Sequence, residues 1–98
     1  DAKNEAQRAE VEAWVAEFLP NIGENLQAVV TLTELGRGAK YASAVRVEVQ
    51  DASTGEMRSI SLFENGVLDD LPDEAERKEN VRYILEQNYL AMTGQKGA

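Results

Sequence analysis

Three successive runs in the middle of the chain alternate apolar and polar residues, and this alternation limits the fold more than any other feature. The runs are LQAVVTLTEL at 26–35, YASAVRVEVQ at 41–50 and MRSISLF at 57–63. Their alternating apolar positions are Leu26, Ala28, Val30 and Leu32, then Val45, Val47 and Val49, then Ile60 and Leu62. Because side chains along a strand point to opposite faces in turn, we expect three strands that each bury one face.

The segments between these runs predict antiparallel hairpins. DASTGE at 51–56 is rich in turn-forming residues, and its Gly55 suits a positive φ. LGRGAK at 35–40 combines two glycines with two cations, which raises the question of a phosphate site. A phosphate cradle needs a helix after the glycine-rich loop, whereas a strand follows here and the ending of a P-loop is missing. We therefore expect LGRGAK to turn the chain, with Arg37 and Lys40 at its tip.

A helical pattern precedes the three runs. Apolar residues recur at helical spacing in EVEAWVAEFLPNI at 10–22, and Pro20 with Gly23 predicts a helix end near Leu19. The apolar positions are Val11, Trp14, Val15, Phe18, Leu19 and Ile22. Trp14 shares a face with the other apolar residues, so we expect it in the core rather than in a ligand site.

A second helical pattern follows the runs. It opens at LPDEAE, where Pro72 suits the first turn and the acids that follow complement the helix dipole. Its inward stripe is Val81, Ile84, Leu85, Asn88 and Met92. Gly94 is expected to cap the helix, and residues 94–98 to form a flexible tail. Asn88 is polar, so we expect it to bond to backbone; the alternative is a polar anchor in a ligand pocket.

The expected architecture is a single α+β domain over residues 1–98: helix, three-stranded antiparallel meander, helix (α-β-β-β-α), with both helices packed on one face of the sheet. This order resembles the double-stranded-RNA-binding fold in its topology. The resemblance implies a lysine-rich start of the second helix on RNA phosphates, but this chain has DDLPDEAE at 69–76 in that place. Because these acids would repel phosphates, we expect no direct binding of nucleic acid.

The composition removes most catalytic and metal-binding chemistry. The chain has no cysteine and no histidine, so it lacks thiolates, the commonest general base and the commonest zinc ligands. An acidic cluster before the second helix does not have the spacing of an EF-hand loop; it consists of Asp69, Asp70, Asp73 and Glu74. We expect no metal, no cofactor and no enzyme activity, and the enzyme alternative is a carboxylate pair with Tyr41 or Lys40.

The net charge of −8 arises in the two helical regions. Residues 1–24 hold six acids and two bases, residues 25–63 four of each, and residues 64–98 eight acids and four bases. With both helices on one side of the sheet, their outer faces form an acidic surface made by Glu10, Glu12, Glu17, Glu74, Glu76, Glu79 and Glu86. Such a surface either keeps a protein soluble or binds a basic partner, as a nucleic-acid mimic does.

Tyr83 and Leu90 form the candidate site. They lie seven residues apart, and therefore nearly aligned, on the helix face opposite the apolar stripe, where one core cannot bury both sets. Glu79, Glu86 and Gln87 flank them, as a polar rim flanks an interface. We predict that Tyr83, Leu90, Glu79 and Glu86 contact a protein partner or a second copy of the chain.

These features predict a small acidic non-catalytic protein-binding module, such as an adaptor, inhibitor or immunity-type protein. The alternatives are a nucleic-acid-mimic decoy that binds a basic protein, and a small-ligand-binding or structural oligomer subunit, which a closed pocket lined by Trp14 and Tyr89 would favour. No apolar run approaches the roughly 20 residues that span a bilayer, and no signal segment opens the chain, so we expect a soluble cytoplasmic protein with no membrane partner. The first residue is Asp1 rather than Met, which leaves removal of a targeting segment as an open alternative.

Overall fold

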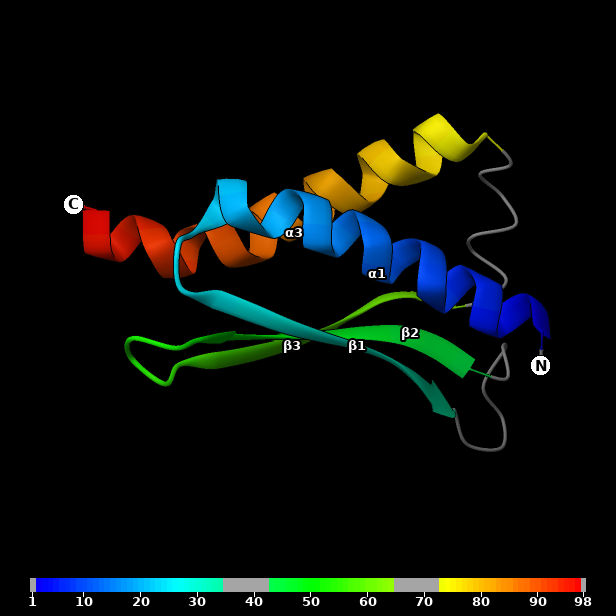
Figure 1. Cartoon of the computed structure of the whole chain (residues 1–98), viewed down its shortest axis with the longest axis horizontal. Coiled ribbons are helices and arrows are strands. Elements are labelled where there is room, and N and C mark those ends of the chain that lie inside the picture. Colours follow the sequence, from blue (N-terminus) through cyan, green and yellow to red (C-terminus); the bar gives the residue numbers. More distant parts are fainter. Residues whose placement is uncertain (1, 35–42, 65–72, 98) are drawn as a thin grey trace.

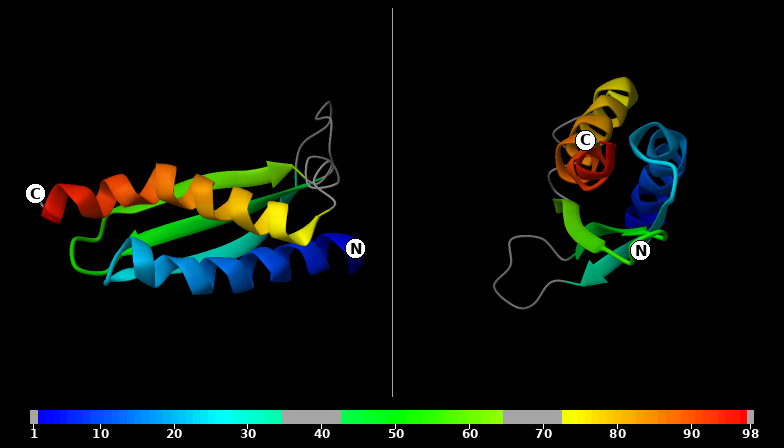
Figure 2. Two further views of the ribbon diagram at one scale, coloured as in Figure 1. Left: turned by 90° about the horizontal axis from the view of Figure 1, so that it is seen from above. Right: turned by 90° about the vertical axis from the view of Figure 1, so that its left-hand side faces the viewer.

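The computed structural model describes the backbone of residues 2–34, 43–64 and 73–97, and the side chains of residues 5–33, 45–62 and 73–90. Its elements are α1 (Ala2–Ile22), β1 (Leu26–Glu34), β2 (Ser43–Asp51), β3 (Met57–Glu64) and α3 (Glu74–Gly97). The strands form one antiparallel sheet in the order β1-β2-β3, and both helices lie over the same face of it (Figure 1; Figure 2, right). The predicted α-β-β-β-α architecture is confirmed.

The register of the sheet turns the alternating residues into one apolar layer. Val30 of β1 lies opposite Val47 of β2, and Ile60 of β3 lies opposite Val47 from the other side. The valines of β2 at 45, 47 and 49 are completely buried, as expected for a central strand with two helices above it. LGRGAK lies outside the described residues, and the strands on either side of it pair antiparallel.

The core lies between the sheet and the helices. α1 packs mainly on β1, α3 contacts β3, and the two helices also pack against each other (Figure 2). The buried apolar residues are Val11, Trp14, Val15, Leu19, Ile22, Val30, Val45, Val47, Val49, Leu62, Val81, Leu85 and Tyr89. Trp14 is among them, which confirms its prediction as a core residue.

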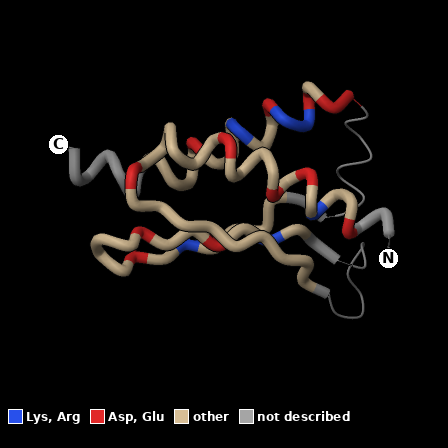
Figure 3. Tube along the Cα trace, viewed as in Figure 1, with Lys and Arg blue, Asp and Glu red and all other residues tan. Residues whose placement is uncertain are grey.

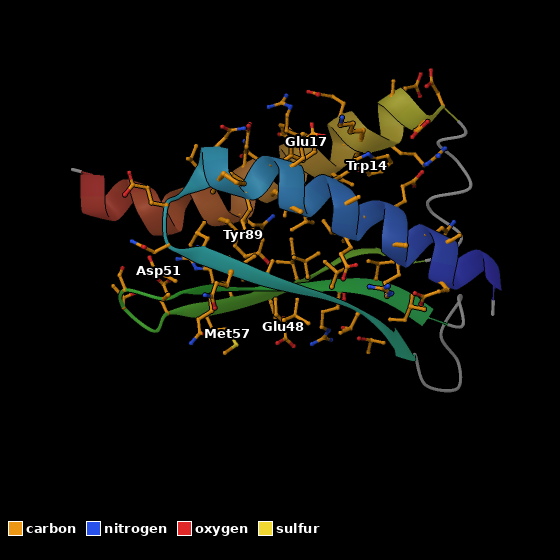
Figure 4. All side chains as sticks on the ribbon, in the orientation of Figure 1. Trp14, Glu17, Glu48, Asp51, Met57 and Tyr89 are labelled. Atoms are coloured by element: carbon orange, nitrogen blue, oxygen red, sulfur yellow. The ribbon has the colours of Figure 1, made fainter. Side chains whose placement is uncertain are left out.

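Tyr89 is a core residue that the helical stripe did not include. It follows Val81 and Leu85 at four-residue intervals, and all three are completely buried. Its hydroxyl donates a 2.9 Å hydrogen bond to the carbonyl oxygen of Val47, so the polar end of the ring is satisfied inside the core (Figure 4). Burial raises the pKa of this phenol to about 12. The buried side of α3 is therefore centred on Val81, Leu85 and Tyr89.

Asn88 lies at the margin of that buried side. Its Nδ2 donates a 2.8 Å hydrogen bond to the carbonyl oxygen of Ile84, which confirms the predicted bond to backbone. The backbone carbonyl oxygen of Asn88 accepts a 3.1 Å hydrogen bond from Nη1 of Arg58 on β3. The side chain therefore bonds within α3, and the backbone of Asn88 joins α3 to the sheet.

α1 is longer at both ends than its apolar pattern predicted. It begins at Ala2, because the residues before the pattern are mostly good helix formers, and it continues through Pro20 to Ile22. The predicted end near Leu19 is wrong. A proline so close to the end of a helix removes only one of its last backbone hydrogen bonds, and burial of Leu19 and Ile22 holds the final turn in place.

α3 begins one residue after a capping aspartate. The carboxylate of Asp73 accepts a 2.9 Å hydrogen bond from the backbone N–H of Ala75, and its carbonyl oxygen accepts one of 3.0 Å from the N–H of Arg77. Asp73 is thus the N-cap and lies before the first turn rather than within it. Pro72, predicted in that turn, lies outside the described residues.

α3 ends at Gly97, so the predicted cap at Gly94 is wrong. One glycine inside a helix costs about 1 kcal/mol relative to alanine, and the Gln95 and Lys96 that follow favour the helical state. The flexibility expected of residues 94–98 stays a prediction.

The hairpin between β2 and β3 has the predicted glycine geometry and a buried aspartate. Gly55 adopts φ 79°, and its N–H donates a 2.7 Å hydrogen bond to the carbonyl oxygen of Asp51. The Asp51 carboxylate accepts hydrogen bonds from Ser53, 2.9 Å from the backbone N–H and 2.6 Å from the hydroxyl. Asp51 is only 2% exposed, and its carboxylate stabilises a turn.

Candidate functional site

The outer face of α3 presents the two apolar residues of the predicted site. Tyr83 is 57% exposed and Leu90 is 49% exposed, whereas Leu85 on the other side of the helix is completely buried. A single helix cannot turn both sides toward one sheet, so these residues face solvent. The structure thus confirms their exposed position, and their contact with a partner stays a prediction.

Glu79 and Glu86 are joined by a residue that the sequence interpretation missed. Arg82 lies between them and binds both carboxylates: Nε is 2.9 Å from Oε2 of Glu79, and Nη1 is 2.8 Å from Oε1 of Glu86. The hydrogen bonds from Arg82 lower the pKa of Glu79 and, together with those to Glu86, raise the pKa of Arg82. Spacings of three and four residues on a helix bring such side chains together and could have predicted this cluster.

A shallow hollow lies beside Tyr83 at the start of α3. It has a volume of about 460 Å³, opens to solvent and is lined mostly by apolar atoms. The lining residues are Ala75, Glu76, Glu79, Asn80 and Tyr83. The hollow has room for one apolar side chain of a partner, and it joins the exposed tyrosine to two acidic residues.

The acidic surface over the helices is largely paired with cations. Five of the seven glutamates predicted to form it make ion pairs: Glu10 with Arg77, Glu12 with Arg8, Glu17 with Lys78, and Glu79 and Glu86 with Arg82. Figure 3 shows basic positions among the acidic ones along both helices. A continuous row of bare carboxylates, as a mimic of nucleic-acid phosphates requires, is absent from the described parts of these helices.

The opposite side of the molecule is an open sheet face, which no described element covers (Figure 2). The register places ten described side chains on it: Gln27, Val29, Thr31, Thr33, Arg46, Glu48, Gln50, Met57, Ser59 and Ser61. Figure 4 shows Glu48 and Met57 pointing away from the helices. Val29 and Met57 are 59% and 57% exposed, so this face also presents two large apolar residues. Val29 and Met57 were missed in the sequence, where each is an apolar residue at a strand position that faces outward.

Two other hollows bear on the small-ligand alternative, which expects a closed pocket lined by Trp14 and Tyr89. One, of about 100 Å³, lies on the open sheet face beside Val29 and Met57. The other, of about 420 Å³, lies where α1 meets β1 and is lined by Leu19, Pro20 and Leu26 among others. Trp14 and Tyr89 line neither of these hollows nor the one beside Tyr83, and both are packed in the core. The described residues give no support to the small-ligand alternative.

The described part of the chain contains no set of side chains that could hold a metal ion. There, no group of three or more acidic, histidine or cysteine side chains could hold a metal ion. Asp69, Asp70, Tyr41 and Lys40, named for the metal and enzyme alternatives, lie outside the described residues. No helix over the described ranges is both long and apolar enough to cross a bilayer.

Comparison with models of protein families gives no match, and comparisons with curated proteins and with solved structures give none. Function is therefore inferred from the two exposed surfaces of this chain.

Proposed function

We propose that this chain is a non-catalytic protein-binding module whose α3 outer face binds a basic segment of another protein. The observation that carries the proposal is the exposure of Tyr83 and Leu90, with Tyr83 lining the hollow at the start of α3. Aromatic residues are enriched among the residues that dominate binding energy at interfaces. Glu79 and Glu86, oriented by Arg82, supply an acidic rim for that contact.

The spacing of the two apolar residues fits a helical partner. Residues seven apart on a helix are separated by about 10.5 Å along its axis. A partner helix laid along α3 could present apolar side chains at the same interval, one of them in the hollow beside Tyr83. Lysine or arginine residues flanking those side chains would meet Glu76 and Glu79.

The charge of the chain supports a basic partner over an acidic one. A net charge of −8 attracts cationic segments and slows the approach of other acidic proteins. Because Glu79 and Glu86 already bind Arg82, their contribution is to steer and orient the partner more than to strengthen the complex. We therefore expect an affinity that falls as salt is added, with Tyr83 and Leu90 contributing most of the contact.

The alternative of a nucleic-acid-mimic decoy has weaker support. Such a decoy would depend on exposed, unneutralised carboxylates, and five of the seven predicted ones are in ion pairs. This surface fits an adaptor or inhibitor better than a decoy, because the apolar pair Tyr83 and Leu90 lies beside the acidic rim of Glu79 and Glu86.

Affinity capture from an extract of the native host, followed by mass spectrometry, tests the proposal. Three baits are compared: the wild type, the double variant Tyr83→Ser with Leu90→Ser, and the matched control Val29→Ser with Met57→Ser on the open sheet face. We expect basic proteins that are retained by the wild type and the control, released by salt, and lost from the α3 variant. Equal recovery by all three folded baits would contradict a binding role for the α3 face.

A further inference from the structure

A second surface leads to an inference that does not depend on the proposed function. We propose that the open sheet face packs against the same face of a second copy of this chain, with Arg46 of each copy paired to Glu48 of the other.

The charge of the open sheet face differs from that of the whole molecule. The chain has a net charge of −8, yet of the ten described side chains on this face only Arg46 and Glu48 are charged, and their charges are opposite. The described part of the face is therefore neutral. Two copies can approach through it without the repulsion that would oppose contact between their acidic helices.

Arg46 and Glu48 have unused bonding capacity. Within the described part of the chain neither forms an ion pair, whereas Arg8 and Arg82 on the helices each bind two glutamates. Arg46 makes one long hydrogen bond, 3.5 Å from Nη1 to the hydroxyl of Ser59. Its Nε is buried and has no hydrogen-bond partner. A buried donor without an acceptor costs free energy, which a carboxylate from another molecule would recover after a small rotation of the guanidinium.

The position of this pair selects one arrangement of two copies. β2 is the central strand, and Arg46 and Glu48 lie on either side of Val47 along it. Consider a two-fold axis that lies between the two sheets, runs perpendicular to the strands and passes over Val47. It makes the two central strands antiparallel. Each Arg46 then faces the Glu48 of the other copy, so the contact forms twice. The parallel arrangement would place like charges opposite each other.

The neighbouring side chains fit the same arrangement. In the sheet, Thr31 is next to Arg46, and Val29 and Ser59 are next to Glu48. The two-fold axis therefore places the exposed Val29 against Thr31 of the other copy. Packed sheets lie about 10 Å apart, a distance that arginine and glutamate side chains can bridge.

Contact through the face is favoured over contact through the β1 edge. Nη1 of Arg8 on α1 donates a 3.2 Å hydrogen bond to the carbonyl oxygen of Val30, so α1 already occupies a backbone acceptor of this edge strand. An edge that is partly capped in this way is a poorer template for a strand of another molecule.

The size of the face predicts a weak dimer. Three strands of about eight residues span roughly 26 Å by 14 Å, which is smaller than the contact of a stable complex. We expect a dissociation constant of roughly 10 to 500 µM, as for transient interfaces. Self-association must therefore be measured over a wide range of protein concentration.

Sedimentation equilibrium of charge-reversal variants tests the pairing. Arg46→Glu puts only acids at the paired positions, and we expect its dimer to weaken by about tenfold or more. Glu48→Arg should have the same effect. The double swap Arg46→Glu with Glu48→Arg restores opposite charges and should return the dissociation constant to within about threefold of the wild type. An equimolar mixture of the two single variants should form a heterodimer more readily than either forms a homodimer.

Circular dichroism and the thermal midpoint serve to check folding, and Tyr83→Ser with Leu90→Ser serves as the matched control that should dimerise like the wild type. A wild type that stays monomeric to about 1 mM would overturn the proposal, since a contact weaker than that is nonspecific. An unchanged dimer in Arg46→Glu, or a dimer lost only in the α3 variant, would overturn it as well. If Arg46→Glu does not fold, Glu48→Arg and the double swap decide the question.

Discussion

The outer face of α3 and the open sheet face each expose two large apolar residues, but they differ in whether their charged side chains form ion pairs within the chain. On α3, Arg82 reaches Glu79 three residues before it and Glu86 four residues after it. On β2, Arg46 and Glu48 lie two residues apart on one face and form no ion pair in the described structure. A helix brings side chains three and four apart together, whereas neighbours on one face of a strand are separated by about 6.7 Å. The helical spacing thus explains the pairing on α3. At the two-residue spacing, Glu56 and Arg58 form an ion pair at the start of β3, whereas Arg46 and Glu48 on β2 remain for another molecule.

The largest expected effect compares the two sides of α3. Leu85→Ala should lower the free energy of unfolding by about 2 to 5 kcal/mol, because a completely buried leucine leaves a cavity. Leu90→Ala, the same change on the exposed side, should alter it by less than about 0.5 kcal/mol. Urea unfolding followed by circular dichroism measures both. Similar losses in the two variants would mean that both sides of α3 are packed and that its outer face is not a free surface.

A smaller effect concerns the hydroxyl that ties α3 to the sheet. Tyr89→Phe removes the hydrogen bond to Val47 and should cost about 1 kcal/mol at neutral pH. The pKa of Tyr89 is raised to about 12 in the folded protein, against about 10 in an unfolded chain. Its stabilising contribution is therefore complete below about pH 10 and is lost as the pH rises toward about 12. Tyr89→Phe should show less of this alkaline loss than the wild type, with Tyr83→Phe as control.

If the two proteins lose stability in parallel between those pH values, the phenol of Tyr89 does not resist ionisation in the folded state. Absorbance of tyrosinate during the same titration gives an independent measure of its pKa.

The fold was largely predictable because its signals are local and repeated. Apolar and polar residues alternate in 26–35, 41–50 and 57–63, and this alternation predicts the strands. Gly55, which suits a positive φ, predicts the turn of one hairpin. The helix ends were less predictable, since Pro20 and Gly94 each weaken a helix locally while buried neighbours or good helix formers extend it. Such competition depends on tertiary packing, which a local pattern does not contain.

The candidate site was predictable in position but not in its interactions. The seven-residue spacing of Tyr83 and Leu90 correctly predicted two exposed side chains. That Arg82 would bind both flanking glutamates was readable from its spacing but was missed. That the described side chains of the open sheet face are together neutral can be recognised only from the register of all three strands, so no single run of residues could reveal it.

Helix ion pairs should contribute only small amounts of stability. A double-mutant cycle of Glu10→Gln and Arg77→Gln should give a coupling of up to about 1 kcal/mol, because this pair joins two helices and is partly buried. The cycle for Glu79→Gln and Arg82→Gln, a pair within one helix, should give about 0.3 to 0.5 kcal/mol. Chemical unfolding of the wild type, the four single variants and the two double variants supplies both values. Couplings of several kcal/mol would make the helix surface a structural network instead of a solvated face.

The smallest expected effect is that of metal ions on the thermal midpoint. Addition of calcium, zinc or a chelator should leave the thermal midpoint within about 1 °C, since no donor set was found in the described residues. Differential scanning fluorimetry measures this directly, using Trp14 as the probe. A rise of many degrees in the thermal midpoint with micromolar metal would show that acidic side chains form a metal site.

One measurement tests the central claim, that the two faces are separate contact surfaces. Amide chemical shifts of the isotope-labelled protein are recorded first on dilution and then on titration with a lysine- and leucine-rich helical peptide. We predict that dilution moves the signals of Val29, Thr31, Arg46 and Glu48, while the peptide moves those of Glu79, Tyr83 and Glu86. If dilution moves the α3 signals, or if both experiments move the same set, the division of the surface into two independent faces is wrong.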